Sequence, residues 1–347
     1  MDHSLTIGKA IKSTIFFLCR TLAGIRLKWK KIFPGQTKSV LLVGTSEVTV
    51  FDLLDAEEIV AELGDKRSYM VVSRGTRPFA RTKLRERDLN IPQIALPRAL
   101  SRAWDLIIFA DHNNTRWFHA DIPKIKYGHG LTSGKSYGPG GSWAFGASAL
   151  DSRGNSLYDV MFVESSYYRD ITLRENPALH GCLAVVGSLM ADKLMALNHE
   201  REAVRRELGI QAHDRVFVIF STWGPSSLIQ RFGDQLLDQL PEIAADFKIF
   251  FIIHPLNDRE SFGGKDALAD RLETCKQQGI AARVDPTQPW FPYLVAADVV
   301  LTDHTSLFLY YVLLEKPFFF VPLVEDAIME ESLIWTFFEL TEPYTPG

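Results

Sequence analysis

Short apolar segments of strand length alternate with helical segments through most of this chain, and this alternation constrains the fold more than any other feature. The apolar segments are nearly continuous rather than interrupted at every second position. Such runs are typical of strands in a parallel sheet that helices cover on both faces. The expected strands are Val40–Val43, Tyr69–Val72, Leu106–Phe109, Ile125–Tyr127, Val160–Val163, Ala184–Val186, Val216–Phe220, Ile249–Ile253, Val299–Leu301 and Phe318–Val321.

These strands fall into two series, because a polar helical stretch at residues 193–208 separates the first six from the last four. We therefore predict an α/β protein with two Rossmann-like domains facing a cleft, at residues 37–195 and 196–347. The length of 347 residues agrees with two domains, since one domain takes about 150 residues. In such folds the loops at the carboxyl ends of the strands line the ligand site.

Residues 1–36 precede both series and are strongly basic. Residues 1–40 contain eight Lys and Arg and one acidic residue, although the whole chain has a formal net charge of −4. Uncharged residues run only from Ser13 to Cys19, whereas a bilayer-spanning helix needs about 20 apolar residues. We predict an amphipathic helix on an anionic membrane surface, with packing on its own domain or a coiled coil as alternatives. Its apolar stripe consists of Ile11, Ile15, Leu18, Leu22, Ile25 and Trp29.

Several classes of site and partner are excluded by missing patterns. The three cysteines lie far apart, which excludes a disulfide scaffold and a C-x-x-C site. The negative net charge argues against a nucleic-acid partner. The phosphate-loop and nucleophile-elbow motifs are missing, as are a D-x-D pair and H-x-x-x-H spacing. The sequence therefore predicts no metal site and no cofactor.

A glycine-rich loop follows the fourth expected strand and contains the first candidate for catalysis. His129 stands between Gly128 and Gly130, and Lys135 follows. Glycine allows close approach to a ligand, and an imidazole titrates near neutral pH, as general acid or base catalysis requires. We predict that His129 is catalytic and that Lys135 meets a phosphate. The alternative is a flexible loop with a chance histidine.

Three further loops in the second series follow expected strands. His254 precedes Pro255, and this position holds it extended at the end of a strand. Aspartate, threonine and serine follow the strand Val299–Leu301, and these residue types suit both a helix cap and an anion site at a helix N-terminus. The alternatives to a ligand site are a structural role for His254, a buried position for Trp223 and simple helix capping by the residues after Val299–Leu301. The candidate donor-phosphate residues in these loops are Ser221, Thr222, Asp303, Thr305 and Ser306, with Trp223 as a stacking surface.

At these loops the chain resembles the CDP-glycerol glycerophosphotransferase family, which includes the teichoic-acid primases and polymerases. The family's His-Gly loop with a following lysine is similar to His129-Gly130 and Lys135, and its His-Pro pair to His254-Pro255. Its Ala-Asp…Thr-Asp-Tyr-Ser-Ser segment, followed by a helix and Lys-Pro, is similar to Ala297–Ser306 and Lys316-Pro317. The agreement covers roughly residues 100–325, and implies a glycosyltransferase-B-like fold.

The resemblance also implies a function. A member would lie on the cytoplasmic face of the cell membrane as a peripheral protein, and would move a glycerol-phosphate-like group from a CDP-alcohol to a hydroxyl of a lipid-linked or glycan acceptor. His129 would be the base, and His254 would act with Thr305, Ser306 and the amides after Asp303 on the donor pyrophosphate. The alternatives are a nucleotide-sugar glycosyltransferase of the same fold and a non-catalytic membrane adaptor.

Overall fold

The computed structural model describes residues 16, 18–28, 37–62, 64–112, 114–128, 147–254, 257, 266–285, 288–321 and 332–339. Two sheets form within them, and all the paired strands are parallel. This confirms the predicted α/β class with two Rossmann-like units. Described residues up to Gly187 belong to the first compact unit and those from Ser188 to the second. The domain boundary expected between residues 195 and 196 falls inside helix α6, Leu189–His199.

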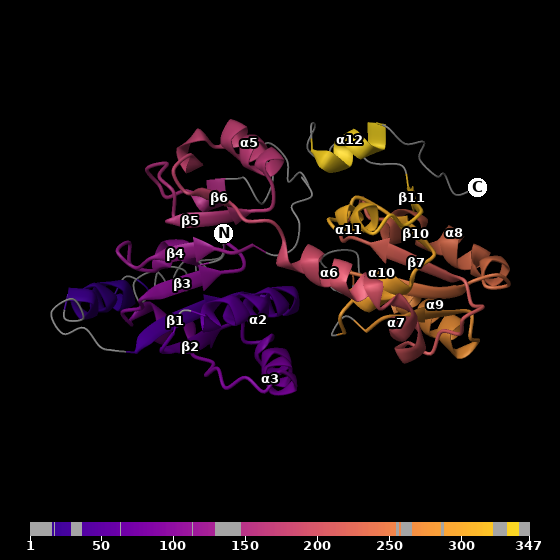
Figure 1. Ribbon diagram of the computed structural model, residues 1–347, viewed down its shortest axis with the longest axis horizontal. Coiled ribbons are helices and arrows are strands. Elements are labelled where there is room, and N and C mark those ends of the chain that lie inside the picture. Colours follow the sequence, from indigo (N-terminus) through magenta and orange to yellow (C-terminus); the bar gives the residue numbers. More distant parts are fainter. Residues whose placement is uncertain are drawn as a thin grey trace, which may run out of the picture. The chain divides into compact units, whose positions relative to one another are not determined.

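The first unit contains a sheet of six strands in the order β2-β1-β3-β4-β5-β6. All six strands expected in this part of the chain are present, shifted by up to three residues at their ends (Figure 1). They are β1 (Lys38–Val43), β2 (Lys66–Val71), β3 (Leu106–Phe109), β4 (Lys124–Lys126), β5 (Val160–Val163) and β6 (Leu183–Val185).

Helices cover this sheet on both faces, which explains the continuous apolar runs. Val40 and Leu42 of β1 pack with Leu53 of α2 (Glu47–Ala61), whereas Leu41 and Val43 belong to a separate core around Trp104. Ser46 begins α2 with a capping box, its side chain accepting from the Thr49 amide. The remaining helical elements are α3 (Arg77–Glu86), α4 (Leu96–Leu100), α5 (Ser166–Glu175), and the short helices η1 (Thr115–Trp117), η2 (Ala147–Ala149) and η3 (Pro177–Leu179).

The N-terminal helix of residues 18–28 packs on the first unit through a face other than the predicted stripe. Phe16, Ala23 and Leu27 are buried against this unit, and the Phe16 ring lies 5.2 Å from that of Trp117. The stripe residues Leu18, Leu22 and Ile25 are instead about half exposed. The helix therefore has a docked face and a separate apolar outer face. Ile11, Ile15 and Trp29 lie outside the described residues.

The second unit contains a sheet of five strands in the order β11-β10-β7-β8-β9. Its strands are β7 (Val216–Ser221), β8 (Lys248–Ile253), β9 (Ala281–Arg283), β10 (Val299–Thr302) and β11 (Phe318–Phe320). The four strands expected here are confirmed, and β9 was missed. Two alanines and an arginine make up β9, and none of them is a β-branched or aromatic residue of the kind that marks a strand.

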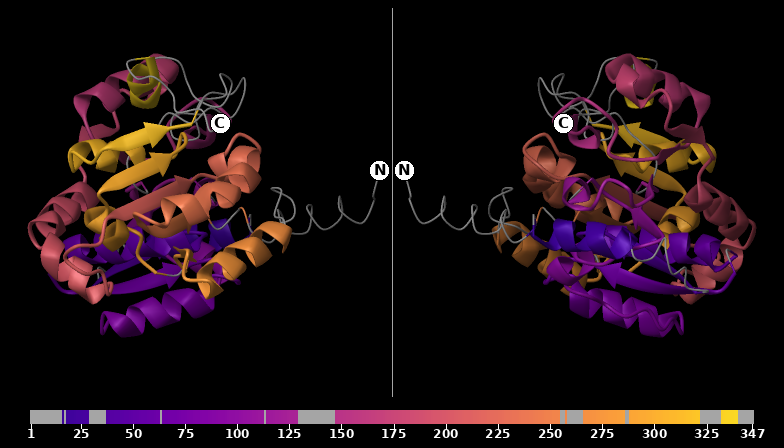
Figure 2. Two further views of the ribbon diagram at one scale, coloured as in Figure 1. Left: turned by 90° about the vertical axis from the view of Figure 1, so that its right-hand side faces the viewer. Right: turned by 90° about the vertical axis from the view of Figure 1, so that its left-hand side faces the viewer.

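Helices lie on both faces of this sheet as well. The helical stretch expected at residues 193–208 is divided at Glu200 into α6 and α7 (Arg201–Glu207). Phe308 and Tyr311 of α11 pack on one face, and Leu236 and Leu240 of α8 on the other. Figure 2 shows α8 and α11 on these opposite sides of the sheet. The other helices are α8 (Leu228–Ile243), α9 (Asp266–Gln277), α10 (Phe291–Ala296), α11 (Phe308–Leu313) and α12 (Leu333–Glu339).

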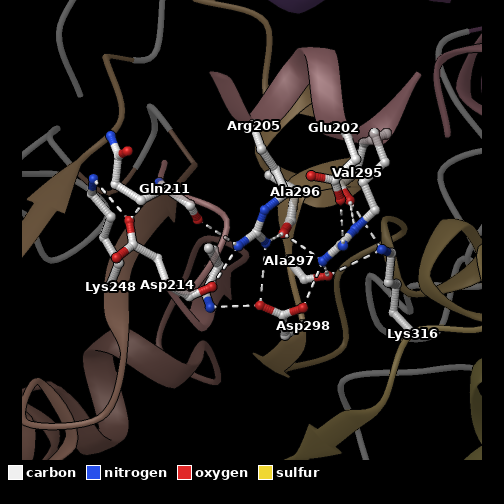
Figure 3. A network of polar contacts seen from close by, with 12 residues as sticks. Glu202, Arg205, Gln211, Asp214, Lys248, Val295, Ala296, Ala297, Asp298 and Lys316 are labelled. Atoms are coloured by element: carbon white, nitrogen blue, oxygen red, sulfur yellow. Dashed lines mark hydrogen bonds and ion pairs between the residues drawn. The ribbon is translucent and has the colours of Figure 1, made fainter. Parts of the chain in front are cut away.

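A network of charged side chains joins α7, α10 and the start of β10 (Figure 3). Arg201 and Arg205 bind opposite oxygens of Asp298, with N–O distances of 2.6 and 3.3 Å, and the Val216 amide donates to the same carboxylate. Arg201, Arg205 and Lys316 also donate to carbonyls at the end of α10, where the helix dipole favours cations. Because Asp298 precedes β10, this network lies at the amino edge of the sheet, away from the expected ligand edge.

Candidate functional site

The predicted residues of the second unit meet at the carboxyl edge of its sheet. β10, β7 and β8 are adjacent strands, and the chain leaves them through Asp303, Ser221 and His254 respectively. The His254 amide donates to the Ser221 carbonyl at 3.0 Å. The three predicted loops are therefore neighbours, at the edge where open α/β sheets bind ligands.

Asp303 is fully buried and joins two of these loops. Its carboxylate accepts from the Ser221 hydroxyl at 3.1 Å and from the Thr222 amide at 3.0 Å. It also accepts from the Leu228 amide at 2.8 Å. Leu228 is the first residue of α8, so a side chain from the end of β10 caps a helix that follows β7.

Asp303 does not cap the helix that follows it in the sequence, as the alternative of simple helix capping would require. Sequence proximity favours Asp303 as a cap for the helix that follows it, but α11 begins at Phe308 without a side-chain cap. The second amide of α8, from Ile229, donates to the Ser221 hydroxyl at 3.1 Å. Two amides that could bind an anion at the α8 N-terminus therefore already have protein acceptors. The geometry makes Asp303 a positioning residue, since its negative carboxylate and buried position suit it poorly to touch a phosphate.

Thr305 and Ser306 lie just beyond this buried cluster. The Thr305 hydroxyl accepts from the Leu307 amide at 3.4 Å. Ser306 is partly exposed, and its hydroxyl makes no hydrogen bond to any described residue. Of the hydroxyl groups predicted at this edge, that of Ser306 is the most available to a ligand.

His254 lies near one aromatic residue, Trp223, and one polar residue, Asn257. The rings of His254 and Trp223 have centroids 6.2 Å apart. Asn257 is buried, and its amide nitrogen donates to the Thr222 carbonyl at 2.6 Å. Asn257 was not recognised from the sequence, because an asparagine shortly after His-Pro carries no distinctive spacing.

A second polar group lies at the carboxyl edge of the first sheet. The Thr45 hydroxyl donates to buried Asp111 at 2.7 Å, and buried Lys126 donates to the Ala110 carbonyl at 2.8 Å. Burial lowers the pKa of Lys126 to about 8, although the nearby carboxylate of Asp111 raises it. The sequence did not indicate this group, since Lys126 stands within an expected apolar strand.

The predicted glycine-rich loop begins at this same edge. Gly128 has a φ of +96°, a backbone conformation that favours glycine over other residues. His129, Gly130 and Lys135 lie outside the described residues. Within the described part of the chain, no group of three or more His, Cys, Asp or Glu could hold a metal ion.

Comparisons with known proteins identify a family and a shared fold. A family model described as CDP-Glycerol:Poly(glycerophosphate) glycerophosphotransferase matches residues 61–326. A structure of the wall teichoic acid polymerase TagF, soaked with CDPG, is 13% identical, with a TM-score of 0.56, and the match covers 92% of this chain and 80% of that one. Another TagF structure is 14% identical, has a TM-score of 0.56, and covers 82% and 70% of the two chains.

The fold is shared with another class of enzyme. UDP-GlcNAc 2-epimerase from Neisseria meningitidis, bound to UDP-GlcNAc, is 13% identical, with a TM-score of 0.52 and coverage of 82% of both chains. At these identities the likeness shows the fold alone. No curated protein matches the chain at a significant level.

Proposed function

We propose, because the chain belongs to the CDP-glycerol:poly(glycerophosphate) glycerophosphotransferase family, that it transfers glycerol phosphate from CDP-glycerol to a hydroxyl of a lipid-linked or glycan acceptor in teichoic acid synthesis. The observation that carries this is the convergence of Ser221, Thr222, His254 and Asp303 at one carboxyl edge of the second unit. A TagF structure soaked with CDPG has the same fold, which supports a cytidine nucleotide as the donor.

The reaction forms one P–O bond and breaks another. The acceptor hydroxyl oxygen attacks the β-phosphorus of CDP-glycerol, the bond from that phosphorus to the bridging oxygen breaks, and CMP leaves. We assign His129 as the base that takes the hydroxyl proton, since histidine is the side chain most often used for general base catalysis. Positioning and charge stabilisation do most of the remaining work in phosphoryl transfer.

The second unit supplies the donor side in this proposal. His254, Thr305 and Ser306 face the donor pyrophosphate, and Lys135 adds a positive charge. Asp303 and Ser221 act indirectly, because their hydrogen bonds fix the start of α8 and the Thr222 loop. The amino-edge network around Asp298 has no part in chemistry.

The proposal places the protein at the cytoplasmic face of the membrane. None of the described helices is long and apolar enough to cross a bilayer. Support comes from the N-terminal helix, whose outer face exposes Leu18, Leu22 and Ile25 beside Arg26 and Lys28. Apolar residues flanked by bases are typical of helices that lie in the interface of an anionic membrane.

A donor panel with a histidine variant tests the reaction. We expect CMP release from CDP-glycerol in the presence of acceptor, without UDP or GDP release from sugar nucleotides, and persistence of activity in EDTA. His129→Ala should lower kcat by 10²–10⁴-fold while donor affinity changes little. His213→Ala is the matched control, since His213 is 86% exposed.

Four outcomes would overturn parts of this proposal. Release of UDP from a sugar nucleotide would identify a glycosyltransferase instead. Nucleotide binding without turnover would favour an adaptor. Turnover by His129→Ala at the wild-type rate would remove His129 from the mechanism, and strict dependence on Mg²⁺ or Mn²⁺ would exclude metal-independent transfer.

A further inference from the structure

Helix α3 and the loop before it carry an unusual excess of positive charge. Residues 73–87 contain six Lys and Arg and one acidic residue. Lys83 pairs with Glu86 at 2.8 Å, and Arg87 pairs with Asp55 and Glu58 at 3.0 and 2.9 Å. The other four basic residues are Arg74, Arg77, Arg81 and Arg85. Their side chains make no hydrogen bond or ion pair with any described residue.

We call these four residues the α3 arginine surface. Arg77, Arg81 and Arg85 recur every fourth residue, so they share one side of the helix, about 6 Å apart per step. Arg81 and Arg85 are exposed, whereas Ala80 and Leu84 of the same helix are buried. The Nε atom of Arg77 is buried and has no hydrogen-bond partner. Arg74, also exposed, extends the surface into the preceding loop.

The surface begins at the carboxyl edge of the first sheet. α3 follows directly after β2, and the Thr76 hydroxyl donates to the Thr45 carbonyl at the end of β1, at 3.2 Å. Thr45 in turn donates to Asp111 in the polar group at this edge. The arginines therefore start at the same carboxyl edge of the sheet from which the His129 loop departs.

The N-terminal helix of residues 18–28 docks at the opposite edge of this sheet. The Arg26 guanidinium donates to the Ser101 carbonyl, and Gly24 lies against the His119 ring. Ser101 precedes β3 and His119 precedes β4, so both contacts lie at the amino edge. The α3 arginine surface is therefore not a continuation of the face that exposes Leu18, Leu22 and Ile25.

The chemistry of the surface points to a long anion. Like charges at this spacing repel one another, and an anion with several charges would offset that repulsion. Arg77 to Arg85 spans about 12 Å along the helix, which is longer than the two adjacent phosphates of a nucleotide diphosphate. No large apolar residue of α3 is exposed, whereas a helix lying in a membrane interface buries apolar side chains there.

We propose that the α3 arginine surface binds the phosphodiester chain of the acceptor polymer outside the reaction centre. This rests on the proposed function, whose family acts on poly(glycerophosphate). Each repeat of that chain carries one negative charge, so successive phosphates can contact successive arginines. Contacts along the chain keep an elongating acceptor near the carboxyl edge between transfers.

A charge-matched pair of variants tests the surface in the full chain. One variant carries Arg77→Gln, Arg81→Gln and Arg85→Gln. The control carries Arg153→Gln, Arg169→Gln and Arg206→Gln, which remove the same charge from other surface positions. Isothermal titration measures the affinity for poly(glycerol phosphate) chains at low and moderate salt.

We expect the α3 variant to bind the chains about tenfold more weakly, from three surface ion pairs of modest strength each. The control should bind as the wild type does, and wild-type affinity should fall with salt. KM for a long acceptor should rise in the α3 variant, whereas KM for a single-unit acceptor and for CDP-glycerol should not. A single Arg81→Gln exchange at an exposed position provides a milder variant should the triple one fold poorly.

Unchanged polymer affinity in the α3 variant, or equal loss in the control, would overturn the inference. So would loss of binding to phosphatidylglycerol vesicles with polymer affinity retained, since that result would make the surface a membrane contact. Arginine-dependent polymer binding without turnover of CDP-glycerol would refute the proposed reaction and leave the surface intact. Turnover with arginine-independent polymer binding would refute the surface and leave the reaction intact.

Discussion

Asp303 illustrates how a single buried side chain can hold two loops in place. Its carboxylate accepts from Ser221, Thr222 and Leu228, which lie on either side of one loop. The side chain therefore links the end of β10 to the start of α8. A phosphate at this edge would meet Ser306 and the backbone that Asp303 has positioned.

We predict that Asp303→Ala lowers the free energy of unfolding by about 3 kcal/mol, because two buried amides lose their acceptor. Urea unfolding followed by tryptophan fluorescence measures this loss. Ser306→Ala is the control and should leave stability unchanged while weakening donor binding, since hydrogen bonds to charged groups contribute about 1.5–3 kcal/mol. Wild-type stability of Asp303→Ala would contradict the positioning role.

Lys126 gives a second prediction at this scale, through its titration. Burial lowers its pKa to about 8, whereas an unfolded lysine titrates near 10.4. Between these values the unfolded chain binds more protons than the folded one, so stability rises with pH. Lys124 and Lys316 have pKa values lowered in the same way, chiefly by burial, to about 8.

We therefore expect the melting temperature of the wild type to rise from about pH 7.5 to 9.5, and the rise to be smaller in Lys126→Met. Differential scanning fluorimetry across this range tests it. The exposed Lys28→Met exchange is the control and should keep the full rise. Identical pH profiles for wild type and Lys126→Met would show that the Lys126 ammonium is not destabilised by burial.

Among the secondary-structure elements, the N-terminal helix combines two apolar faces, one docked on the first unit and one exposed. Ala23 and Leu27 are buried against the first unit, and the Arg20 guanidinium donates to the Arg116 carbonyl at 3.3 Å. Leu18, Leu22 and Ile25 face outward. The predicted membrane helix and the alternative of packing on its own domain thus correspond to different faces of one helix.

We predict that Leu18→Ser, Leu22→Ser and Ile25→Ser together weaken binding to anionic vesicles without lowering the melting temperature. Each exposed side chain loses apolar burial in the membrane, worth about 1–2 kcal/mol. Vesicle co-sedimentation measures the binding. Leu27→Ser is the matched control and should lower the melting temperature instead, because it removes a buried contact. Undiminished vesicle binding by the triple variant would place the membrane contact elsewhere.

The whole molecule repeats one plan in both units, a parallel sheet with a polar group at its carboxyl edge. In the second unit the opposite edge carries its own charged network, where Asp298 binds Arg201 and the buried Arg205. Burial would raise the pKa of Asp298, but the Val216 amide and the two arginines outweigh it and lower that pKa. In our proposal, stability and ligand binding therefore belong to opposite edges of one sheet.

We predict that Asp298→Ala lowers the free energy of unfolding by about 3 kcal/mol, since it leaves buried Arg205 without its carboxylate. Donor affinity of the folded protein should stay within twofold of wild type. Chemical unfolding and nucleotide titration below the melting transition provide the two measurements. A large change in donor affinity at unchanged stability would reverse this assignment of the two edges.

The sequence by itself determined the parallel architecture and the edge at which the polar loops lie. Strands buried on both faces are mostly apolar, so ten of the eleven strands of the described residues could be located from the sequence, most of them as continuous apolar runs. Only β9 was not predicted, because a short strand of small and polar residues contains no apolar run. The loops of Ser221, His254 and Asp303 followed from where these strands end.

Tertiary structure alone decided which groups those loops bring into contact. Asp303 caps α8 rather than the helix beside it in the chain, because the order of strands places β10 next to β7. In the first sheet, the adjacency of β1 and β3 places the Thr45 hydroxyl beside its acceptor Asp111. A local sequence pattern reflects the burial of each residue. Hydrogen bonds and ion pairs depend instead on which residues become neighbours, and only the folded sheet determines that.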